Sequence, residues 1–568
     1  MMLYQWEFAD IKDEAEIARL TNDFDIHPII AQILLDRNLD TQSKIENFFQ
    51  PKLENLLDPF LMLHMEKAVN RVIRALSDGE QILVYGDYDV DGVTGVAILY
   101  NVLFNLGGKV SFFIPDRFND GYGVSKKGIN VANSRKSSLI ITVDCGITAV
   151  EEISYANEMG IDVIVCDHHE PGPEIPDAFA ILDPKLKESP YPFRDLAGCG
   201  VAFKFMQGLV NKLGYTGEIV NEYLDLIALG TSADIVPLVD ENRILVHHGL
   251  NQINQSPRNG LFAILEILGL TDHDLTVSTI VFVLAPRLNA VGRMSNAKKA
   301  VHLLSSKSLQ QSRNIARILE NENKARKNID EITFREADSY VENNIDLSSK
   351  RVLVLAKDDW HPGVIGIVAS RLMEKYSRPT VLISIQDGMG RGSARSAHNF
   401  DIYEAFRKLS YLLENYGGHK FAAGMNIVSE NIPEFDKLIN ELALQEIEVH
   451  EMVSKIKIDA RVTLDQFDAN FLNGLKSLAP FGPSNMRPVF VTDNLQIYGN
   501  VTKVGNNHLK VKFKQNGVVI DAIGYNLGES VPMLRETDLR LRCAYVLEEN
   551  KWNGQTTIQM RIKDFEVQ

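Results

Sequence analysis

Three short apolar segments of the chain each end directly at acidic residues, and this pattern constrains the fold more than any other feature. Residues 82–85, 139–143 and 163–166 are runs of mostly aliphatic side chains, bounded by glycine or charged residues. Such runs are typical of strands that are buried on both faces of a parallel sheet. Residues 93–106 and 148–159 have a helical pattern between the strands. This alternation predicts an α/β fold with a mostly parallel sheet.

Carboxylates and a pair of histidines follow these strands and one later apolar segment. They are Asp87, Asp89, Asp91, Asp144, Asp167, His168, His169 and Asp234. Taken alone, Asp91 would be typical of a helix N-cap. The carboxyl ends of parallel strands meet at one sheet edge, however, and like carboxylates gathered there repel unless a cation neutralises them. Oxygen and imidazole ligands without paired thiolates suit Mn²⁺ or Mg²⁺. The clusters therefore predict a two-metal phosphoesterase site.

The motifs around these residues resemble those of a known superfamily. GDYDVDG at 86–92, the strand ending at Asp144, DHH at 167–169 and SADIVP at 232–237 are similar to the signature of the DHH phosphoesterase superfamily. Further motifs resemble the RecJ family of bacterial single-strand-specific exonucleases. These are PRLNAVGR at 286–293, WHPGVIGIVASR at 360–371, RGSARS at 391–396 and GGHKFAAGM at 417–425.

The resemblance implies a set of metal ligands around a bridging carboxylate, which it assigns to Asp144. The other ligands that it implies are Asp91, His168 and Asp234 for one divalent cation, Mn²⁺ or Mg²⁺, and Asp89 with Asp87 for the other. Tyr85 stands where the pyrophosphatase branch of the superfamily has a histidine. This departure argues against a pyrophosphatase and leaves water or Asp87 as the remaining ligand.

Other residues of the motifs are candidates for substrate contact. Imidazolium and guanidinium groups can stabilise charge that develops on phosphate, so His169, Arg287 and Arg293 are predicted to contact it rather than the metals. The predicted catalytic residues are Asp89, Asp91, Asp144, His168, His169, Asp234 and Arg287. The further predicted substrate contacts are Asn289, His361, Arg391, Ser393, Arg395, Gly417, Gly418 and His419. The alternative for Gly417 and Gly418 is an ordinary turn after a helix.

The sequence changes character near residue 446. Apolar residues alternate with Lys510, Lys512 and Lys514, and Asn516-Gly517 leads into an apolar run at 518–523. This pattern predicts a β-hairpin with one basic face. With further strand-like runs on both sides, it suggests a small barrel, and an OB-fold is the natural candidate. The lysines suit either a solvated face or nucleic acid. Resemblance to the RecJ family, whose C-terminal barrel binds single strands, favours nucleic acid. Candidates for base stacking, or equally for core packing, are Tyr498, Phe513 and Tyr525.

We expect five regions along the chain. They are an N-terminal helical region at 1–80 that packs on the DHH domain, a DHH domain at 81–305, a connecting helix at 306–347, a second α/β domain of the DHH-associated type at 348–445, and an OB-fold at 446–568. A chain of 568 residues is too long for one hydrophobic core, which agrees with several domains.

Composition excludes some classes of function. The net charge of −16 excludes a simple polybasic DNA-binding protein. No run of about 18 apolar residues and no export signal is apparent, so we expect neither membrane insertion nor secretion. The four cysteines are widely separated, which is typical of a reduced cytoplasmic protein.

The residues and the resemblance together predict an exonuclease that depends on two Mn²⁺ or Mg²⁺ ions. It would degrade single-stranded DNA from the 5′ end to 5′-mononucleotides in recombination and repair. The resemblance implies single-strand-binding protein and a RecQ-type helicase as partners. Two alternatives remain open: a phosphodiesterase of the superfamily that acts on short RNA or cyclic dinucleotides, and a non-catalytic DNA-binding scaffold of the Cdc45 type.

Overall fold

The computed structural model describes residues 4–10, 12–117, 121, 123–397, 400–448, 453–536, 539–552 and 555–568. The chain divides into two compact units. Unit 1 comprises Met1–Asp40, Lys327–Ser477 and Arg487–Gln568, and unit 2 comprises Thr41–Arg326 and Leu478–Met486. None of the helices among these described residues has both the length and the apolar character that crossing a membrane requires.

A five-stranded parallel sheet forms the centre of unit 2. Its strands, in spatial order, are β3 (Lys109–Phe113), β2 (Gln81–Gly86), β4 (Ser137–Val143), β5 (Asp162–Cys166) and β6 (Ala180–Leu182). The chain runs from β2 outward to β3 and then returns to place β4 on the other side of β2. The winding direction therefore reverses between β2 and β4, which creates the crevice where α/β sheets bind ligands. The predicted parallel sheet is confirmed.

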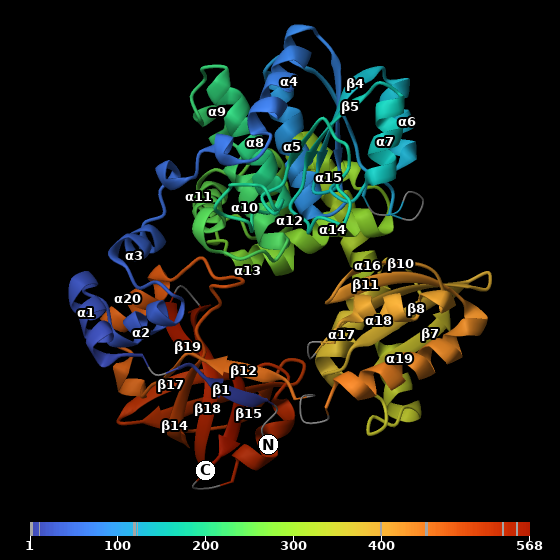
Figure 1. Cartoon of the computed structure of the whole chain (residues 1–568). Coiled ribbons are helices and arrows are strands. Elements are labelled where there is room, and N and C mark those ends of the chain that lie inside the picture. Colours follow the sequence, from blue (N-terminus) through green and yellow to red (C-terminus); the bar gives the residue numbers. More distant parts are fainter. Residues whose placement is uncertain are drawn as a thin grey trace. The chain divides into compact units, whose positions relative to one another are not determined.

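Alternate side chains of these strands face helices on opposite sides of the sheet. Val84 and Ile141 belong to one core cluster, and Leu83 and Ile140 belong to another. The first side is covered by α4 (Met65–Ser77), α5 (Val90–Asn105), α8 (Gly198–Lys212) and α10 (Leu224–Ala233), and the second by α6 (Lys126–Ser134) and α7 (Val150–Glu158). Figure 1 shows α6 and α7 on the opposite side of the strands from α5 and α8. Burial on both faces explains why the strands are aliphatic throughout.

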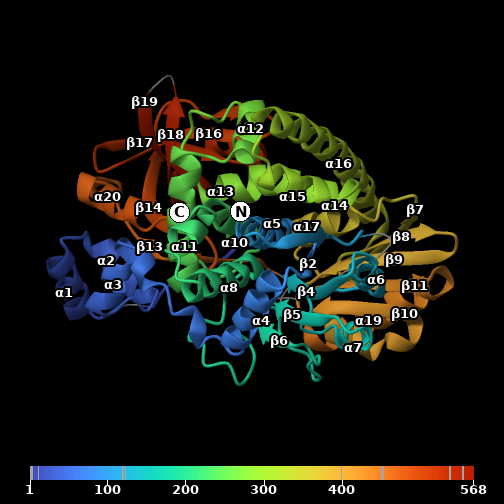
Figure 2. The same ribbon diagram turned by 90° about the horizontal axis from the view of Figure 1, so that it is seen from above.

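Helices complete unit 2. They are α3 (Gln42–Phe49), α9 (Glu218–Asn221), α11 (Asp240–Gln255), α12 (Asn259–Leu268), α13 (Val277–Thr279), α14 (Ala285–Met294) and α15 (Lys298–Ser305). The chain then continues through the single long helix α16 (Leu309–Asn344), which curves visibly in Figure 2. This helix agrees with the expected connecting helix.

A segment distant in sequence, residues 478–486, also packs within unit 2. The guanidinium of Arg243 donates hydrogen bonds to the carbonyl oxygens of Leu478 at 3.2 Å, Ala479 at 2.7 Å and Pro480 at 3.3 Å. The backbone N–H of Leu238 donates to the Pro483 carbonyl at 2.8 Å. These bonds fix the segment against the chain that follows α10.

Unit 1 contains a second α/β sheet. Its strands, in spatial order, are β10 (Leu413–His419), β11 (Ala422–Val428), β9 (Met389–Arg395), β8 (Thr380–Gln386) and β7 (Leu353–Asp358). Strands β7 and β8 are parallel and the other neighbours are antiparallel. Its helices are α17 (Ile365–Tyr376), α18 (Ile402–Lys408) and α19 (Ile432–Glu446).

The C-terminal part of unit 1 is a closed five-stranded barrel, as predicted. Around the barrel the strands are β14 (Phe490–Ile497), β18 (Arg540–Trp552), β19 (Gln555–Val567), β17 (Val518–Gly524) and β16 (His508–Gln515), and a β14–β16 pairing closes the ring. The short strands β13 (Ala460–Arg461) and β15 (Thr502–Val504) flank it, with α20 (Ala469–Ser477) and α21 (Val531–Leu534). Asn516 and Gly517 form the predicted tight turn, with φ values of 51° and 82°.

The N-terminal residues differ from the sequence expectation. The sequence predicts that residues 1–80 are helical and pack together on the DHH domain, but the structure divides them between the two units. Strand β1 (Gln5–Phe8) pairs in parallel with β12 (Lys455–Ile458), and α1 (Glu14–Phe24) and α2 (Pro28–Asp36) lie in the same unit. Asp36 forms an ion pair with Lys457. The pairing escapes sequence analysis because a four-residue strand has no distinctive pattern and its partner lies far along the chain.

Candidate metal centre

The six predicted metal ligands lie together with His169 at the carboxyl edge of the sheet in unit 2. Potential ligand atoms within 4.8 Å of one another form three overlapping groups: Asp87 with Asp89 and Asp144, Asp91 with His168 and Asp234, and Asp144 with His168 and His169. Asp144 and His168 each belong to two groups. Two of these groups share the Asp144 carboxylate and could each hold a cation, at the crevice formed by the loops that follow the paired strands β2 and β4.

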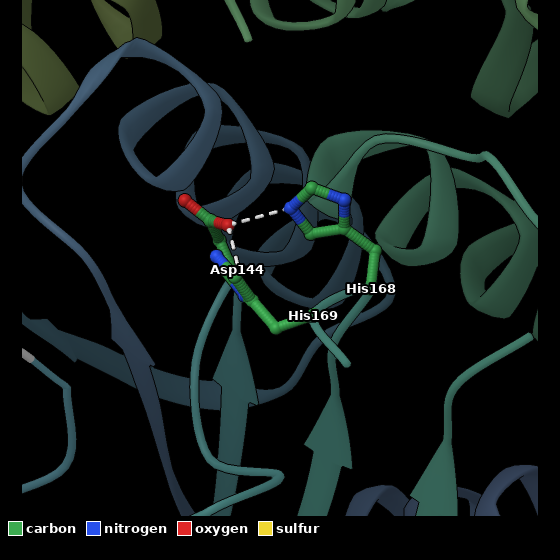
Figure 3. A group of neighbouring side chains, drawn as sticks. All are labelled: Asp144, His168 and His169. Carbon is green, nitrogen blue, oxygen red and sulfur yellow. Dashed lines mark hydrogen bonds and ion pairs between the residues drawn. The ribbon is translucent and has the colours of Figure 1, made fainter. Parts of the chain in front are cut away.

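His168 occupies the middle of the centre. Its Nε2 lies 3.1 Å from Asp144 Oδ1, 3.6 Å from Asp234 Oδ2 and 3.8 Å from Asp91 Oδ2. Figure 3 shows its ring pointing toward the Asp144 carboxylate. Burial, and then the charge of His169, lower the pKa of His168 to about 3. The imidazole is therefore neutral at physiological pH, which is the form that binds metal.

The carboxylates are buried close to one another, and a bound cation would stabilise their ionised form. Burial, followed by the charge of neighbouring acids, raises the pKa of Asp87, Asp144 and Asp234 well above the usual range. The same causes raise the pKa of Asp91 to about 6. Within the described part of the chain, Asp87 Oδ1 and Asp234 Oδ2 are buried oxygens without a hydrogen-bond partner. Unpaired buried carboxylate oxygens are costly, so these residues fit divalent cations.

Asp144 has an unusual backbone conformation. Its φ is +60°, in the left-handed region, which costs a residue other than glycine on the order of 1–3 kcal/mol. Its N–H donates to the Cys166 carbonyl at 3.0 Å, so the conformation is fixed by the neighbouring strand. Strain of this kind at the shared carboxylate is typical of a functional position.

Asp91 is held by the N-terminus of helix α8. Gly198 N donates to its Oδ2 at 2.6 Å and Cys199 N donates to its Oδ1 at 2.9 Å. A Cβ at Gly198 would lie 2.9 Å from Asp91 Oδ2 and 2.8 Å from Asp144 Cβ. Sequence analysis missed this role, although two glycines in GCG at a helix start are a weak signal of close packing.

Asp167, the first residue of the DHH triplet, organises the loops around the centre. Its carboxylate accepts hydrogen bonds from His169 Nδ1 at 2.7 Å, His168 N at 2.8 Å and Ile147 N at 2.9 Å. Burial opposes ionisation, but the hydrogen bond and charge of His169 lower the pKa of Asp167 to about 2. Burial likewise disfavours charge on His169, yet Asp167 raises its pKa to about 9. His169 therefore presents an imidazolium, as its predicted phosphate contact requires.

Tyr85 lies away from the ligands. It is fully buried, and its hydroxyl forms hydrogen bonds with the Gly123 carbonyl at 3.0 Å and Ser125 Oγ at 3.2 Å. Asp87 lies in a group with Asp89 and Asp144, and its predicted role as the remaining ligand stays a prediction. Asp89 caps α5 through a 3.0 Å bond from Gly92 N, so Asp91 is not the N-cap.

Helix α14 carries three predicted substrate residues and packs against the loop that holds Asp87 and Asp89. A Cβ at Gly292 would lie 2.8 Å from the Tyr88 carbonyl, so α14 packs against the segment between Asp87 and Asp89. Arg287 Nε is paired with Glu320 at 2.6 Å. Asn289 Oδ1 is buried without a hydrogen-bond partner among the described residues. The predicted substrate contacts of Arg287, Asn289 and Arg293 remain predictions.

The other predicted substrate residues belong to unit 1. Cross-strand register aligns His419 with Ala422 and Ala422 with Arg395. A Cβ at Gly366, near the start of α17, would lie 2.8 Å from Ser393 Oγ and 3.1 Å from Arg395 Nη2. His361 precedes this helix, and its Nδ1 accepts from Gly363 N at 3.0 Å. Arg391 is an exposed residue of β9.

Gly417 and Gly418 lie in strand β10 rather than in a turn after a helix. Gly418 has a φ of 138°, and a Cβ there would lie 2.4 Å from the Ala422 carbonyl. Residue 418 is therefore a glycine for a structural reason, because β11 approaches too closely for a side chain. Gly417 is exposed, with open space where a Cβ would lie.

The barrel presents the predicted basic face only in part. Lys510 and Lys512 are exposed on β16, but Lys512 pairs with Asp521 at 3.3 Å. Lys514 Nζ lies 5.6 Å from the ring centroid of Tyr498. Phe513 is buried in the barrel, so core packing explains it and base stacking does not. Tyr498 and Tyr525 are half-exposed and remain candidates for base stacking.

Comparison with known proteins agrees with this architecture. The sequence matches the DHH family N-terminal domain at residues 81–231, the DHHA1 domain at 349–445 and the RecJ OB domain at 458–564. The fold and the acidic centre thus define a DHH-family protein. Its similarity extends along the whole chain, and the chain belongs to the RecJ family.

Individual relatives support this assignment. The single-stranded-DNA-specific exonuclease RecJ of Bacillus subtilis is 36% identical over 99% of this chain and 71% of its own length. The protein of the same name from Escherichia coli is 31% identical over 95% of this chain and 96% of its own length. The crystal structure of RecJ from Thermus thermophilus in complex with Mn²⁺ has a TM-score of 0.83 and 29% identity, covering 99% of this chain and 79% of that one.

Proposed function

We propose that this protein is a single-stranded-DNA-specific exonuclease that hydrolyses phosphodiester bonds with two divalent cations, Mn²⁺ or Mg²⁺. The observation that carries the proposal is the pair of ligand groups that share Asp144. The names of its RecJ relatives support the substrate, and their solved complexes with Mn²⁺ and Mg²⁺ support the metals. We further propose that cleavage starts at the 5′ end and releases 5′-mononucleotides.

The side chains divide the chemistry between them. Asp144 would be shared by the two cations, one of which Asp91, His168 and Asp234 would hold and the other Asp87 and Asp89. When bound there, two divalent cations activate a water molecule and stabilise the charge that develops on the scissile phosphate. Asp91 keeps its orientation through the Gly198 and Cys199 amides. The imidazolium of His169 contacts a non-bridging phosphate oxygen, and Asp167 fixes its orientation.

The other parts of the chain select the substrate. Ser393 and Arg395 lie beside the N-terminal turn of α17, a position suited to a phosphate. We propose that the DNA strand contacts these two residues and also His361, Arg391, Asn289, Arg293 and the β10 residues Gly417, Gly418 and His419. The barrel contacts the strand through Lys510, Lys512 and Lys514. We propose a cytoplasmic location, and single-strand-binding protein and a RecQ-type helicase as partners. These three assignments rest on the family.

Digestion of end-labelled DNA tests the proposal. Single strands with either end labelled and the matching duplex are incubated with Mn²⁺ or with EDTA. At early times we expect labelled mononucleotide only from the 5′-labelled single strand, and only with Mn²⁺, because the 3′ label is released last. Asp144→Ala is expected to reduce turnover about a thousandfold or more, because no other carboxylate can bridge the cations. The matched control is Asp177→Ala, which changes an exposed aspartate of the same unit and should cleave normally. Equal digestion of duplex, or activity in EDTA, would contradict the proposal.

A further inference from the structure

Ile235 directly follows the candidate ligand Asp234 and is unusual in two respects, its backbone conformation and its exposure to solvent. Its φ is +64°, in the left-handed region, which is a genuine outlier for a β-branched residue. It occupies the first position after the C-cap of α10, where glycine or asparagine is usual. The residue is also 68% exposed although it is apolar. Neither the left-handed backbone conformation nor the exposed apolar side chain of Ile235 stabilises the fold.

The structure on both sides of Ile235 prevents this turn from relaxing. On one side, Asp234 N donates to the Gly230 carbonyl at 3.0 Å, which completes the helix end. On the other, Leu238 is fully buried, and its N–H donates to the Pro483 carbonyl at 2.8 Å. A conformation that is unfavourable for its own residue persists only where neighbouring contacts enforce it, and this pattern is typical of ligand contacts and active sites.

Ile235 lies next to the metal centre because it directly follows Asp234, a residue of the ligand groups. Consecutive Cα atoms are about 3.8 Å apart, and Asp234 Oδ2 lies 3.6 Å from His168 Nε2. The His169 side chain, on the same edge of the centre, is 43% exposed, so the centre is open to solvent there. A nucleotide whose phosphate reaches these residues has its sugar within reach of the neighbouring side chain.

We propose that Ile235 is a substrate-binding residue whose branched side chain packs against the sugar of the nucleotide at the metal centre. This inference rests on the proposed function and adds a contact that none of the predicted residues supplies. Bases are usually held by aromatic stacking, whereas an aliphatic side chain suits the C–H face of a deoxyribose ring. Burial of both apolar surfaces favours binding, and it also holds the phosphate in register for attack.

A pair of glycine variants separates this contact from the backbone strain. Lys136 is the matched control: it is exposed, has a φ of 59° and stands at the same position after the C-cap of α6, at the opposite edge of the sheet. Ile235→Gly and Lys136→Gly should each raise the unfolding temperature by about 2 °C, because glycine accepts this conformation. Only Ile235→Gly should lower kcat/KM on a 5′-phosphorylated single strand, by about tenfold or more. Ile235→Val, which keeps a branched apolar side chain, should retain kcat/KM within about threefold.

Mn²⁺ titration by calorimetry completes the test. We expect Ile235→Gly to bind Mn²⁺ as the wild-type protein does. Weaker Mn²⁺ binding would overturn the proposal and show instead that Ile235 orients Asp234. Unchanged kcat/KM for Ile235→Gly would also overturn it, provided that the wild-type protein is active and Asp144→Ala is not. If the wild-type protein does not degrade single strands, the proposed function itself fails, which is a distinguishable result.

Discussion

At the scale of single residues, the metal centre depends on a close contact between backbone and carboxylates. Gly198 brings the N-terminus of α8 against Asp91 and Asp144. We predict that Gly198→Ala lowers Mn²⁺ affinity and turnover by about a hundredfold, because the added Cβ displaces groups that must be placed within about 1 Å. Calorimetry and single-turnover cleavage measure the two effects.

Gly208→Ala is the control for this prediction. Gly208 lies in the same helix, and its added Cβ would approach side-chain atoms of Met65 at 3.3 Å and of Val69 at 3.5 Å, away from the ligands. It should leave Mn²⁺ binding unchanged, since alanine also favours the helix. If Gly198→Ala bound Mn²⁺ normally, the α8 N-terminus would be a structural support without influence on the ligands.

The buried carboxylates make stability depend on pH and metal. A carboxyl group whose pKa is raised in the folded protein destabilises the fold as pH rises from its unfolded pKa, about 3.9, through its folded pKa. The folded pKa is about 6 for Asp91, and burial and neighbouring acids also raise the pKa of Asp144 well above its usual range. Bound Mn²⁺ removes this repulsion and requires the ionised form. We therefore predict that the rise in unfolding temperature produced by Mn²⁺ grows from pH 5 to pH 8.

Thermal unfolding with Mn²⁺ or EDTA in the same buffers measures that difference. Comparing the two curves at each pH cancels the titration of groups away from the centre. Asp144→Asn should reduce the Mn²⁺ effect at every pH. A Mn²⁺ effect that is constant from pH 5 to pH 8 would contradict the raised pKa values.

At the scale of elements, the second α/β sheet is predicted to place the strand end without binding metal. Register aligns His419 and Arg395 on strands β10 and β9. His419→Ala and Arg395→Ala should each reduce single-turnover cleavage by about a hundredfold through misplacement of the phosphate. Mn²⁺ affinity should not change. Weakened Mn²⁺ binding would assign these residues to the metal centre, and normal cleavage would remove them from the site.

The barrel strand β16 is expected to contribute long-range attraction to the phosphate backbone. Reversing the charge of Lys510, Lys512 and Lys514 should weaken binding to long single strands. It should also make the affinity less sensitive to salt, because fewer phosphates are neutralised and fewer counterions are released on binding. Lys512 is paired with Asp521, so Lys512→Glu alone should have the smallest effect. Fluorescence anisotropy across a salt series provides the measurement. A triple variant with an unchanged salt dependence would show that the lysines are only a solvated face.

Sequence analysis located elements well where short-range patterns determine them. Asn516-Gly517 determined the hairpin, and the aliphatic runs before Asp87, Asp144 and His168 determined the sheet edge that gathers the ligands. It failed where the partner lies far along the chain. No residue near Asp91 in the sequence indicates that its carboxylate accepts a hydrogen bond from a backbone amide more than 100 residues later. Alternation likewise could not tell whether Phe513 faces the core or a base, because both faces of a barrel strand can accept an aromatic ring.

At the scale of the whole molecule, the chain beyond the boundary expected at residue 446 contributes a segment to unit 2. Residues 478–486 provide three carbonyl acceptors for Arg243 within unit 2. We predict that a chain ending at residue 445 loses about 3 kcal/mol of unfolding free energy in unit 2, because the buried guanidinium of Arg243 loses three hydrogen-bond acceptors, although it keeps its contacts with Phe48. Cleavage of short strands should therefore also decline.

Hydrogen exchange provides the measurement for this truncation. Faster exchange is expected at residues 236–246, which contact the missing segment, relative to the full chain. The triple lysine variant serves as the control, because it changes the barrel surface and leaves residues 478–486 in place. Unchanged exchange at 236–246 in the truncated chain would show that unit 2 is stable without the segment.

The parallel pairing of β1 with β12 has a consequence for synthesis on the ribosome. Gln5 is translated about 450 residues before its partner Lys455. At about 5–20 residues per second, the nascent β1 waits on the order of 20 to 90 s for the strand that it pairs with. During this interval its backbone N–H and C=O groups are open to pairing with other chains. The segment that contains β1 is thus translated early and completes its folding late.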